Sequence, residues 1–314
     1  MKSKRRNNLF WASLALPLFC LSCAYRPLVT ETGYGYGTMW QISVYEKYRD
    51  DALGLISLVG SSSREVETHG TYVNGVASLN QGKEIEASSF LLPLLEKAVD
   101  LQEKTEGYFN PFLGRLTESW LDALKKGEVL EQSMIEAYLN ESQNTHLVFH
   151  GNKVKKEGNA LLDLGGIGKG YLLDKGIASF KEKGIETYLI NAGKSSLGLG
   201  YSDDRKSPFT VTLPNSDLSF TTYGSAISTS ASDEQHYEVG GKVYSHLINA
   251  KTGSALCVYD SITLVGDNAA ELDALSTAFM GMDIEKIKAF CNEFSCKAVI
   301  LKEGKVLYDS IGVK

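Results

Sequence analysis

The sequence predicts an α+β fold in which helices flank mostly antiparallel sheets. Its 314 residues are 43% hydrophobic, which is enough for one large domain or two closely packed ones. Helical patterns dominate the first half of the chain, and short strand patterns follow one another in the second half. No internal repeat or low-complexity linker separates them, so we expect the helices to cover the sheets.

Each expected element follows from the spacing of its apolar residues and from the residues that end it. The strongest helix begins at Ser88, repeats apolar residues at helical spacing and ends at Gly107. Pro93 is tolerated there because it falls in the first turns. The segment 60–82, with its glycines and serines, is expected to be an irregular loop that carries Asn80. The expected helices cover 50–59, 88–106, 115–126, 131–142, 168–182, 268–281 and 283–294, and the expected strands cover 41–45, 146–150, 153–156, 187–190, 196–199, 209–213, 226–229, 244–248, 261–265, 297–301 and 306–308.

The N-terminus has the order of a bacterial export signal. Basic residues within 2–6 precede an apolar run over 9–19, which is too short to span a membrane. A small residue then precedes Cys23, as in the lipobox of bacterial lipoproteins. We therefore predict a lipoprotein signal peptide over 1–22, an extended lead-in over 23–37, and a lipid on Cys23 that anchors the protein to a membrane on the bacterial periplasmic side. A plain signal peptide and an uncleaved anchor are the alternatives.

Charge and cysteine usage exclude some classes of protein. The net charge of −6 argues against a nucleic-acid partner, which would need a basic face to offset phosphates. Beyond the N-terminal segment only Cys257, Cys291 and Cys296 remain, so at least one of these thiols is unpaired within the chain. Cys291 and Cys296 would either bridge or pack as small apolar residues. No cysteine and histidine spacing typical of structural zinc occurs.

A glycine-rich segment at the start of the helix expected over 168–182 has the composition of an anion site. It reads Asp163-Leu-Gly-Gly-Ile-Gly-Lys-Gly-Tyr171. Glycines let the backbone approach a ligand closely, and the first N–H groups of a helix favour an anion. The spacing matches neither the P-loop nor the dinucleotide-binding fingerprint. A tight turn from strand to helix explains the glycines equally well.

Asp273 and Thr277 stand four residues apart on an expected helix, so their oxygens share one face. A carboxylate and a hydroxyl suit Mg²⁺, which takes few protein ligands and keeps positions for phosphate and water. The alternative is an exposed Asp273 near the helix start, where a carboxylate favours the helix dipole.

His246 is a candidate general base, because it follows an expected strand and precedes the turn Asn249-Ala-Lys-Thr-Gly253. A histidine with its hydrogen bonds satisfied in the core is the alternative. The remaining histidines lack comparable glycine and hydroxyl neighbours.

Six segments of the chain resemble motifs of the ApbE-type FAD:protein FMN transferases and follow one another in the same order. These proteins are exported flavin-processing enzymes often made as lipoproteins. The resemblance runs from about Gly37 to the C-terminus, so residues 38–314 are expected to form one domain with an ApbE-like fold. The segments are Thr38-Met-Trp40, Ser78-Leu-Asn80, Glu106-Gly-Tyr-Phe-Asn-Pro-Phe-Leu-Gly114 with Trp120, the glycine-rich segment with Asp174, Thr229-Ser230 together with Ser245-His246…Thr252-Gly253, and Asp273-Ala-Leu-Ser-Thr277.

The resemblance implies a ligand set. Mg²⁺ would be held by Asp273, Thr277 and a backbone carbonyl of the turn at Gly166, and it would bridge the pyrophosphate of FAD. The residues implied around FAD are Met39, Trp40, Asn80, Lys169, Asp174, Gly193, Thr229, Ser230 and His246.

The resemblance also implies a reaction. His246 would deprotonate a Ser or Thr hydroxyl of an exported target protein, and the hydroxyl would attack the phosphorus on the FMN side and expel AMP. Targets in this family resemble subunits of the sodium-pumping NADH:quinone oxidoreductase and of Rnf-type complexes.

Several positions depart from the family pattern. Gly193-Lys194-Ser195 stands where the family has Gly-Gly-Asp, and an aromatic residue expected shortly before Asn80 is replaced by His69 or Gly70. Two alternatives to transfer therefore stay open: hydrolysis of FAD to FMN and AMP by a periplasmic pyrophosphatase, and a lipoprotein that binds FAD without turnover.

Overall fold

The computed structural model describes residues 28–201, 208–232, 236–256 and 258–314. The predicted signal peptide over 1–22 and the predicted anchor Cys23 lie outside these ranges, as does Cys257.

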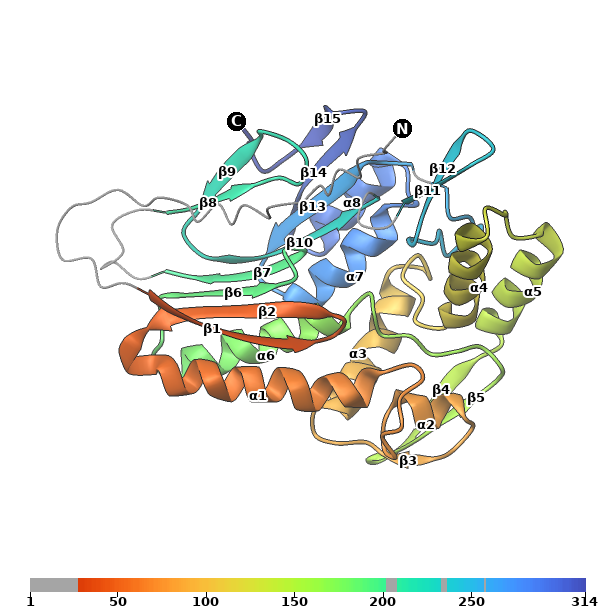
Figure 1. The fold of residues 1–314 in the computed structure, drawn as a ribbon, viewed down its shortest axis with the longest axis horizontal. Coiled ribbons are helices and arrows are strands. Elements are labelled where there is room, and N and C mark those ends of the chain that lie inside the picture. Colours follow the sequence, from red (N-terminus) through yellow and green to blue (C-terminus); the bar gives the residue numbers. More distant parts are fainter. Residues whose placement is uncertain (1–27, 202–207, 233–235, 257) are drawn as a thin grey trace, which may run out of the picture.

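A central antiparallel sheet dominates the fold, and the described residues contribute eight strands to it (Figure 1). Every neighbouring pair runs antiparallel. In their order across the sheet, the strands are β1 (Leu28–Gly35), β2 (Thr38–Tyr45), β6 (Tyr188–Ala192), β7 (Ser196–Gly200), β10 (Ser225–Ala231), β13 (Ser261–Gly266), β14 (Lys297–Lys302) and β15 (Lys305–Asp309).

Smaller antiparallel sheets lie around the central one. They are β3 (Ile85–Glu86) with β5 (Lys153–Glu157) and β4 (His146–His150), the hairpin of β8 (Phe209–Thr212) and β9 (Ser219–Thr222), and the hairpin of β11 (His236–Val239) and β12 (Lys242–Ser245). The β8–β9 hairpin packs on the central sheet through an apolar cluster that includes Phe209, Phe220 and Ile227.

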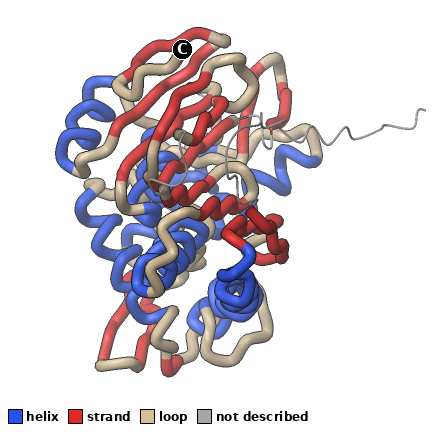
Figure 2. The backbone as a smooth tube through the Cα atoms, turned by 90° about the vertical axis from the view of Figure 1, so that its left-hand side faces the viewer, coloured by secondary structure: helices blue, strands red, loops and turns tan. Residues whose placement is uncertain are grey.

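Helices cover one end of the central sheet and the face opposite the β8–β9 hairpin. They are η1 (Glu46–Tyr48), α1 (Arg49–Val66), α2 (Val76–Asn80), α3 (Leu91–Lys104), α4 (Gly114–Lys125), α5 (Gln132–Gln143), α6 (Gly168–Glu182), α7 (Ala269–Phe279) and α8 (Ile284–Glu293). α1 packs on β1 and β2, α6 on β6 and β7, and α7 on β10 and β13. Figure 2 shows these helices gathered along one side of the strands. The predicted α+β architecture is confirmed.

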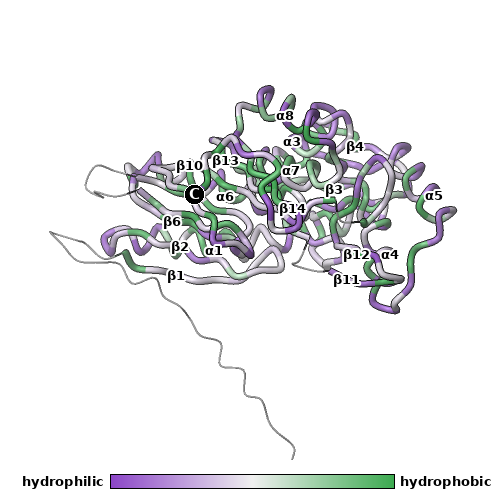
Figure 3. Tube along the Cα trace, turned by 90° about the horizontal axis from the view of Figure 1, so that it is seen from above, coloured by the Kyte–Doolittle hydropathy of each residue, from purple (hydrophilic) through white to green (hydrophobic). Residues whose placement is uncertain are grey.

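The spacing of apolar residues explains the buried helices. α3 buries Leu91, Leu94, Leu95, Ala98 and Leu101, which share one helical face. The helix begins at Leu91, three residues later than predicted, and the hydroxyl of Ser88 accepts the N–H groups of Phe90 and Leu91 where the chain enters it. The chain leaves the helix through Gly107, whose φ of 76° is left-handed. α7 is apolar around most of its circumference and runs through the middle of the molecule (Figure 3).

The loop expected over 60–82 is wrong in part, because α1 continues to Val66 and α2 forms near its end. Tertiary contacts stabilise the serine-rich turns of α1. Ser62 donates to the carbonyl of Leu58 at 2.6 Å and accepts the hydroxyl of Tyr36 at 2.9 Å. Packing therefore overrides the weak helix propensity of this stretch.

Two further segments differ from expectation. Residues 28–35 of the extended lead-in form β1, the edge strand that pairs with β2 along its whole length. The strand expected over 244–248 ends earlier, because β12 stops at Ser245 and leaves His246 in the following loop.

Cys291 and Cys296 are buried free thiols. They lie close enough for a thiol–thiol hydrogen bond, which is the main reason that the pKa of Cys296 is raised. In the part of the chain that the structure describes, no helix combines the length and the apolar character needed to cross a bilayer.

Candidate functional site

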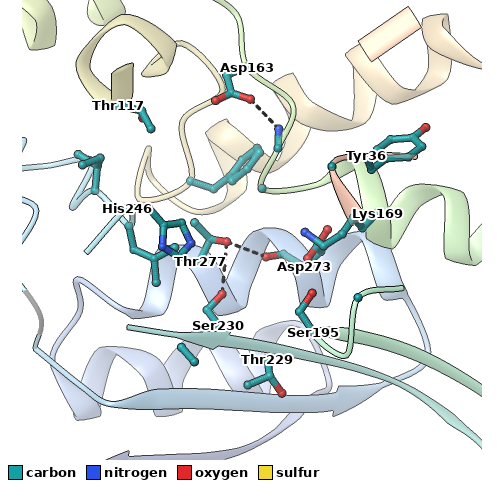
Figure 4. A pocket seen from close by; sticks show the side chains of 18 of the residues that line it. Tyr36, Thr117, Asp163, Lys169, Ser195, Thr229, Ser230, His246, Asp273 and Thr277 are labelled. Carbon is teal, nitrogen blue, oxygen red and sulfur yellow. Dashed lines mark hydrogen bonds between the residues drawn. The ribbon is translucent and has the colours of Figure 1, made fainter. Parts of the chain in front are cut away.

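Most of the segments singled out in the sequence contribute to one cavity of about 710 Å³ (Figure 4). Its walls are the β1–β2, β6–β7 and β8–β9 turns, the segment from Tyr108 into α4, the end of β10, the start of α6, one side of α7 and the loop after β12. The predicted site residues that line it are Gly166, Lys169, Gly193, Thr229, Ser230, His246, Asp273 and Thr277.

The glycine-rich segment brings the start of α6 against α7. The N–H of Gly170 donates to Oδ2 of Asp273 at 2.9 Å. A Cβ at position 170 would lie 2.2 Å from the carbonyl oxygen of Ala269, so this close approach requires glycine. Gly166 lines the cavity instead. Helix packing and open backbone near a ligand site therefore both account for these glycines.

Asp273 is buried in α7, with 4% of its surface exposed. Its Oδ1 accepts from the hydroxyls of Ser196 at 3.4 Å and Ser228 at 3.3 Å, and its Oδ2 accepts from the Gly170 N–H. The alternative of an exposed carboxylate beside the helix dipole is wrong. All three donors are neutral, so they leave a buried negative charge that a cation would compensate.

The oxygen atoms of Asp273, Thr277 and Gly166 fit a hard divalent cation. Figure 4 shows Asp273 and Thr277 side by side, and the hydroxyl of Thr277 donates to the carbonyl of Asp273 at 3.2 Å. A Cβ built on Gly166 would lie 3.6 Å from Oγ1 of Thr277, so the turn passes next to this hydroxyl. A carboxylate, a hydroxyl and a backbone carbonyl suit Mg²⁺. No cluster of three or more His, Cys, Asp or Glu residues suited to a metal occurs in the described ranges.

A buried network of hydroxyl groups supports Asp273, and sequence reasoning missed it. Ser276 contacts the hydroxyls of Ser228 at 3.2 Å and Ser230 at 3.0 Å, and Ser228 in turn donates to Asp273. Groups that orient a metal-binding carboxylate in this way tune the affinity of the site. Serines on β10 alternate toward α7, but their spacing alone does not identify the partner helix.

Asp174 and Asn80 do not line the cavity; each holds a segment that does. The carboxylate of Asp174 accepts the N–H groups of Ala269 at 2.8 Å and Ala270 at 2.9 Å, at the start of α7. Burial raises the pKa of Asp174, and these two N–H groups oppose part of that effect. The amide of Asn80 bonds both the N–H and the carbonyl of Leu162, directly before the glycine-rich segment.

Met39 and Trp40 also lie outside the cavity lining. The side chain of Trp40 is fully buried, and its Nε1 donates to the carbonyl of Gly35 at 3.1 Å. The side chain of Met39 is 58% exposed, and its carbonyl accepts the N–H of Gly193 at 3.0 Å. The two residues therefore fix the β1–β2 and β6–β7 turns that form one wall.

His246 reaches the cavity from the loop after β12 and is half-buried (Figure 4). The turn that follows is held by Asn249, whose Oδ1 accepts the N–H groups of Lys251 and Thr252. Trp120 donates to the carbonyl of Gly253 at 2.7 Å. This support fixes the loop, so the imidazole stays at the cavity wall rather than in the core.

Several lining residues had no place in the predicted site, notably Tyr36, Tyr108 and Asp163. Burial raises the pKa of Asp163, while the N–H of Gly165 lowers it. Asp163 opens the glycine-rich segment, which is a signal that would have identified it. Tyr36 and Asp163 also line an adjoining cavity of about 530 Å³.

A model of the ApbE family matches residues 36–300. The chain belongs to this family. Among curated relatives, the FAD:protein FMN transferase of Rhodobacter capsulatus is 27% identical over 291 residues, which cover 87% of this chain and 55% of the relative. The FAD:protein FMN transferase of Treponema pallidum is 28% identical over 228 residues, covering 65% of this chain and 63% of the relative. The chain thus matches little more than half the length of the first relative.

Solved ApbE structures share the fold. The ApbE protein of Thermotoga maritima superimposes with a TM-score of 0.78 at 22% identity, covering 90% of this chain and 97% of that one. The flavin transferase ApbE of Vibrio cholerae gives a TM-score of 0.71 at 20% identity, covering 91% and 96%. At these identities the likeness shows the architecture alone.

Proposed function

We propose that this protein transfers FMN from FAD to a Ser or Thr hydroxyl of an acceptor protein and releases AMP, with Mg²⁺ as its metal. The observation that carries this proposal is one cavity that combines oxygen ligands for a hard cation, a lysine at a helix start and an accessible histidine. The names of the relatives support the same reaction.

The wall formed by α6 and α7 suits the pyrophosphate. Lys169 is in the first turn of α6, so its ammonium group and the first N–H groups of the helix both favour an anion. Asp273, Thr277 and the carbonyl of Gly166 would hold Mg²⁺, which when bound neutralises charge on the pyrophosphate and on the leaving AMP.

His246 is suited to activate the acceptor hydroxyl. Its imidazole takes the proton of the acceptor hydroxyl, whose oxygen then forms a bond to the phosphorus on the FMN side. The bond from that phosphorus to the bridging oxygen breaks, and AMP leaves with the bonding electrons. FAD and the hydroxyl thereby become the FMN ester and AMP, and one proton passes to the imidazole.

We further propose exported acceptors, namely subunits of the sodium-pumping NADH:quinone oxidoreductase or of Rnf-type complexes, and attachment of this protein to a membrane through lipid on Cys23, on the periplasmic side. The N-terminal order of basic, apolar and small residues before a cysteine supports the location.

Incubation of the purified protein with FAD and a candidate acceptor, in Mg²⁺ or in EDTA, tests the reaction. We expect covalent flavin fluorescence on the acceptor and an equal amount of AMP, both only in Mg²⁺. Free FMN and AMP in equal amounts would instead indicate a pyrophosphatase, and intact bound FAD would indicate a binding protein. Each of these outcomes contradicts transfer.

A further inference from the structure

Several residues around the cavity have left-handed backbone conformations, which are unfavourable for residues other than glycine. The described residues include six non-glycine residues at left-handed φ, and the three that line the cavity are Tyr36 at 56°, Lys194 at 69° and Asn215 at 50°. Asparagine tolerates this region, whereas a long side chain such as lysine pays a steric cost there. Such strained residues concentrate at functional sites, where the surrounding structure holds them.

The turn that carries Lys194 is held firmly. Gly193 precedes it at a φ of 66°, and a Cβ at position 193 would lie 2.3 Å from Oγ1 of Thr38. The N–H of Lys194 donates to Oδ1 of Asn191 at 2.8 Å. Glycine would fit position 194 with less strain, so the turn itself gives no reason for a lysine.

The charges of the cavity give such a reason. Among the described residues, its lining contains the carboxyl groups of Asp163 and Asp273 and the ammonium groups of Lys169 and Lys194. Lys169 stands on α6 and Lys194 on the β6–β7 turn, so the two cations approach the cavity from different elements. A phosphate between these two elements would contact both ammonium groups.

The position of His246 indicates which phosphate this is. In Figure 4, Lys169 and Ser195, the neighbour of Lys194, lie on one side of the cavity, and His246 lies on the other. In phosphoryl transfer the attacking and leaving oxygens are roughly in line. If the hydroxyl attacks from the His246 side, the leaving group departs toward the β6–β7 turn.

We propose that Lys194 binds the phosphate of the AMP half of FAD and stabilises AMP as the leaving group. This inference rests on the proposed function. It predicts a contact with AMP and none with the phosphate of FMN, and it assigns the lysine a role in the departure of AMP rather than in activation of the hydroxyl.

Substitution of Lys194 separates charge from backbone strain. Lys194→Gly removes the ammonium group and relaxes the turn, so its melting temperature should equal or slightly exceed that of the parent. Lys194→Gln removes the charge and keeps the strain. Both variants should bind AMP about 10- to 100-fold more weakly, the usual range for a lost charged hydrogen bond. Their affinity for FMN should not change.

Glu303→Gly is the matched control. Glu303 has a φ of 51° in the β14–β15 turn and lines neither cavity, so relaxing it should leave AMP affinity unchanged. Calorimetric titration with AMP and with FMN, in Mg²⁺, provides the readout. AMP affinity that is unchanged in both Lys194 variants, or an equal loss for AMP and FMN, would overturn the inference. A parent protein that binds neither FAD nor AMP would overturn the proposed function as well.

Discussion

Asp273 serves the fold and the proposed metal with the same carboxylate. Its Oδ2 holds the first turn of α6 through Gly170, and its Oδ1 is oriented by Ser196 and Ser228. The sequence predicted that Asp273 and Thr277 share a helix face, but it did not reveal that Asp273 is buried. Removing the whole side chain would therefore disturb packing as well as metal binding.

Asp273→Asn separates these two effects. The amide oxygen can accept the Gly170 N–H and the amide nitrogen can donate to a serine hydroxyl, so we expect stability to change by about 1 kcal/mol or less. Mn²⁺ replaces Mg²⁺ in this experiment because it is paramagnetic. Loss of the charge should weaken Mn²⁺ binding at least about tenfold, as measured by electron paramagnetic resonance. Unchanged Mn²⁺ affinity in a folded variant would show that this carboxylate is not a metal ligand.

His246→Ala tests the proposed base. Loss of a general base slows proton abstraction by about 100-fold or more, so flavin transfer should fall by that factor. FAD affinity should change little, because Lys169, Asp273 and Thr277 remain. The measurements are single-turnover transfer and equilibrium FAD binding. Parallel losses in both would instead mark His246 as a ligand contact.

At the scale of elements, the contact between α6 and α7 places the site. α6 contributes Lys169 and the glycine turn, whereas α7 contributes Asp273 and Thr277. Two residues outside the cavity fix this contact. Gly170 allows the close approach, and Asp174 binds the first N–H groups of α7. Their role is to bring the two helix starts together.

Gly170→Ala should separate the helices. The added Cβ would meet the carbonyl of Ala269 at 2.2 Å and Cβ of Asp273 at 2.7 Å, so we expect a loss of about 1–3 kcal/mol or more. Gly54→Ala in α1 is the control, because nothing lies within 4 Å of its Cβ, and it should stabilise the helix by about 0.5–1 kcal/mol. Urea unfolding measures both. A Gly170 variant as stable as the parent would refute the close contact.

Asp174 gives the α6–α7 contact a pH dependence. Burial raises the pKa of Asp174 above its unfolded value, so the folded state binds its proton more tightly. The stability from this group is therefore fully present below the unfolded pKa of about 4 and is lost as the pH rises through the folded pKa. Asp174→Asn replaces the carboxyl group with an amide that does not ionise, so this contribution to the pH dependence of stability disappears.

We therefore expect Asp174→Asn to be less stable than the parent by a larger amount near pH 4, close to the unfolded pKa, than near pH 7. The deficit should shrink toward neutral pH, because ionisation of the buried carboxyl group costs the parent stability that the uncharged amide of Asn does not lose. Urea unfolding at both pH values, in EDTA, provides the comparison. A deficit that grows with rising pH would contradict the raised pKa.

At the scale of the whole molecule, the sequence predicted the architecture and most of the cavity but not the long-range bonds. Local spacing identified α3 and the motif around Asp273 because each pattern lies within one element. Asn80 and Asp174 were predicted as ligand contacts, yet they hold Leu162 and the start of α7 through bonds to distant segments. Such partners depend on packing, which local patterns do not encode. Tyr36 gave no signal either, because it stands at the first position of its left-handed turn, where Asn, Asp or Gly is usual.

The intact mass of an acceptor protein tests the proposed transfer most directly. After incubation with this protein, FAD and Mg²⁺, the mass should rise by one FMN less one water, with one AMP released per flavin attached. Asp273→Asn and an acceptor whose hydroxyl residue is changed to Ala should each abolish the increase. An unchanged acceptor mass, while the parent protein splits FAD into FMN and AMP, would contradict transfer.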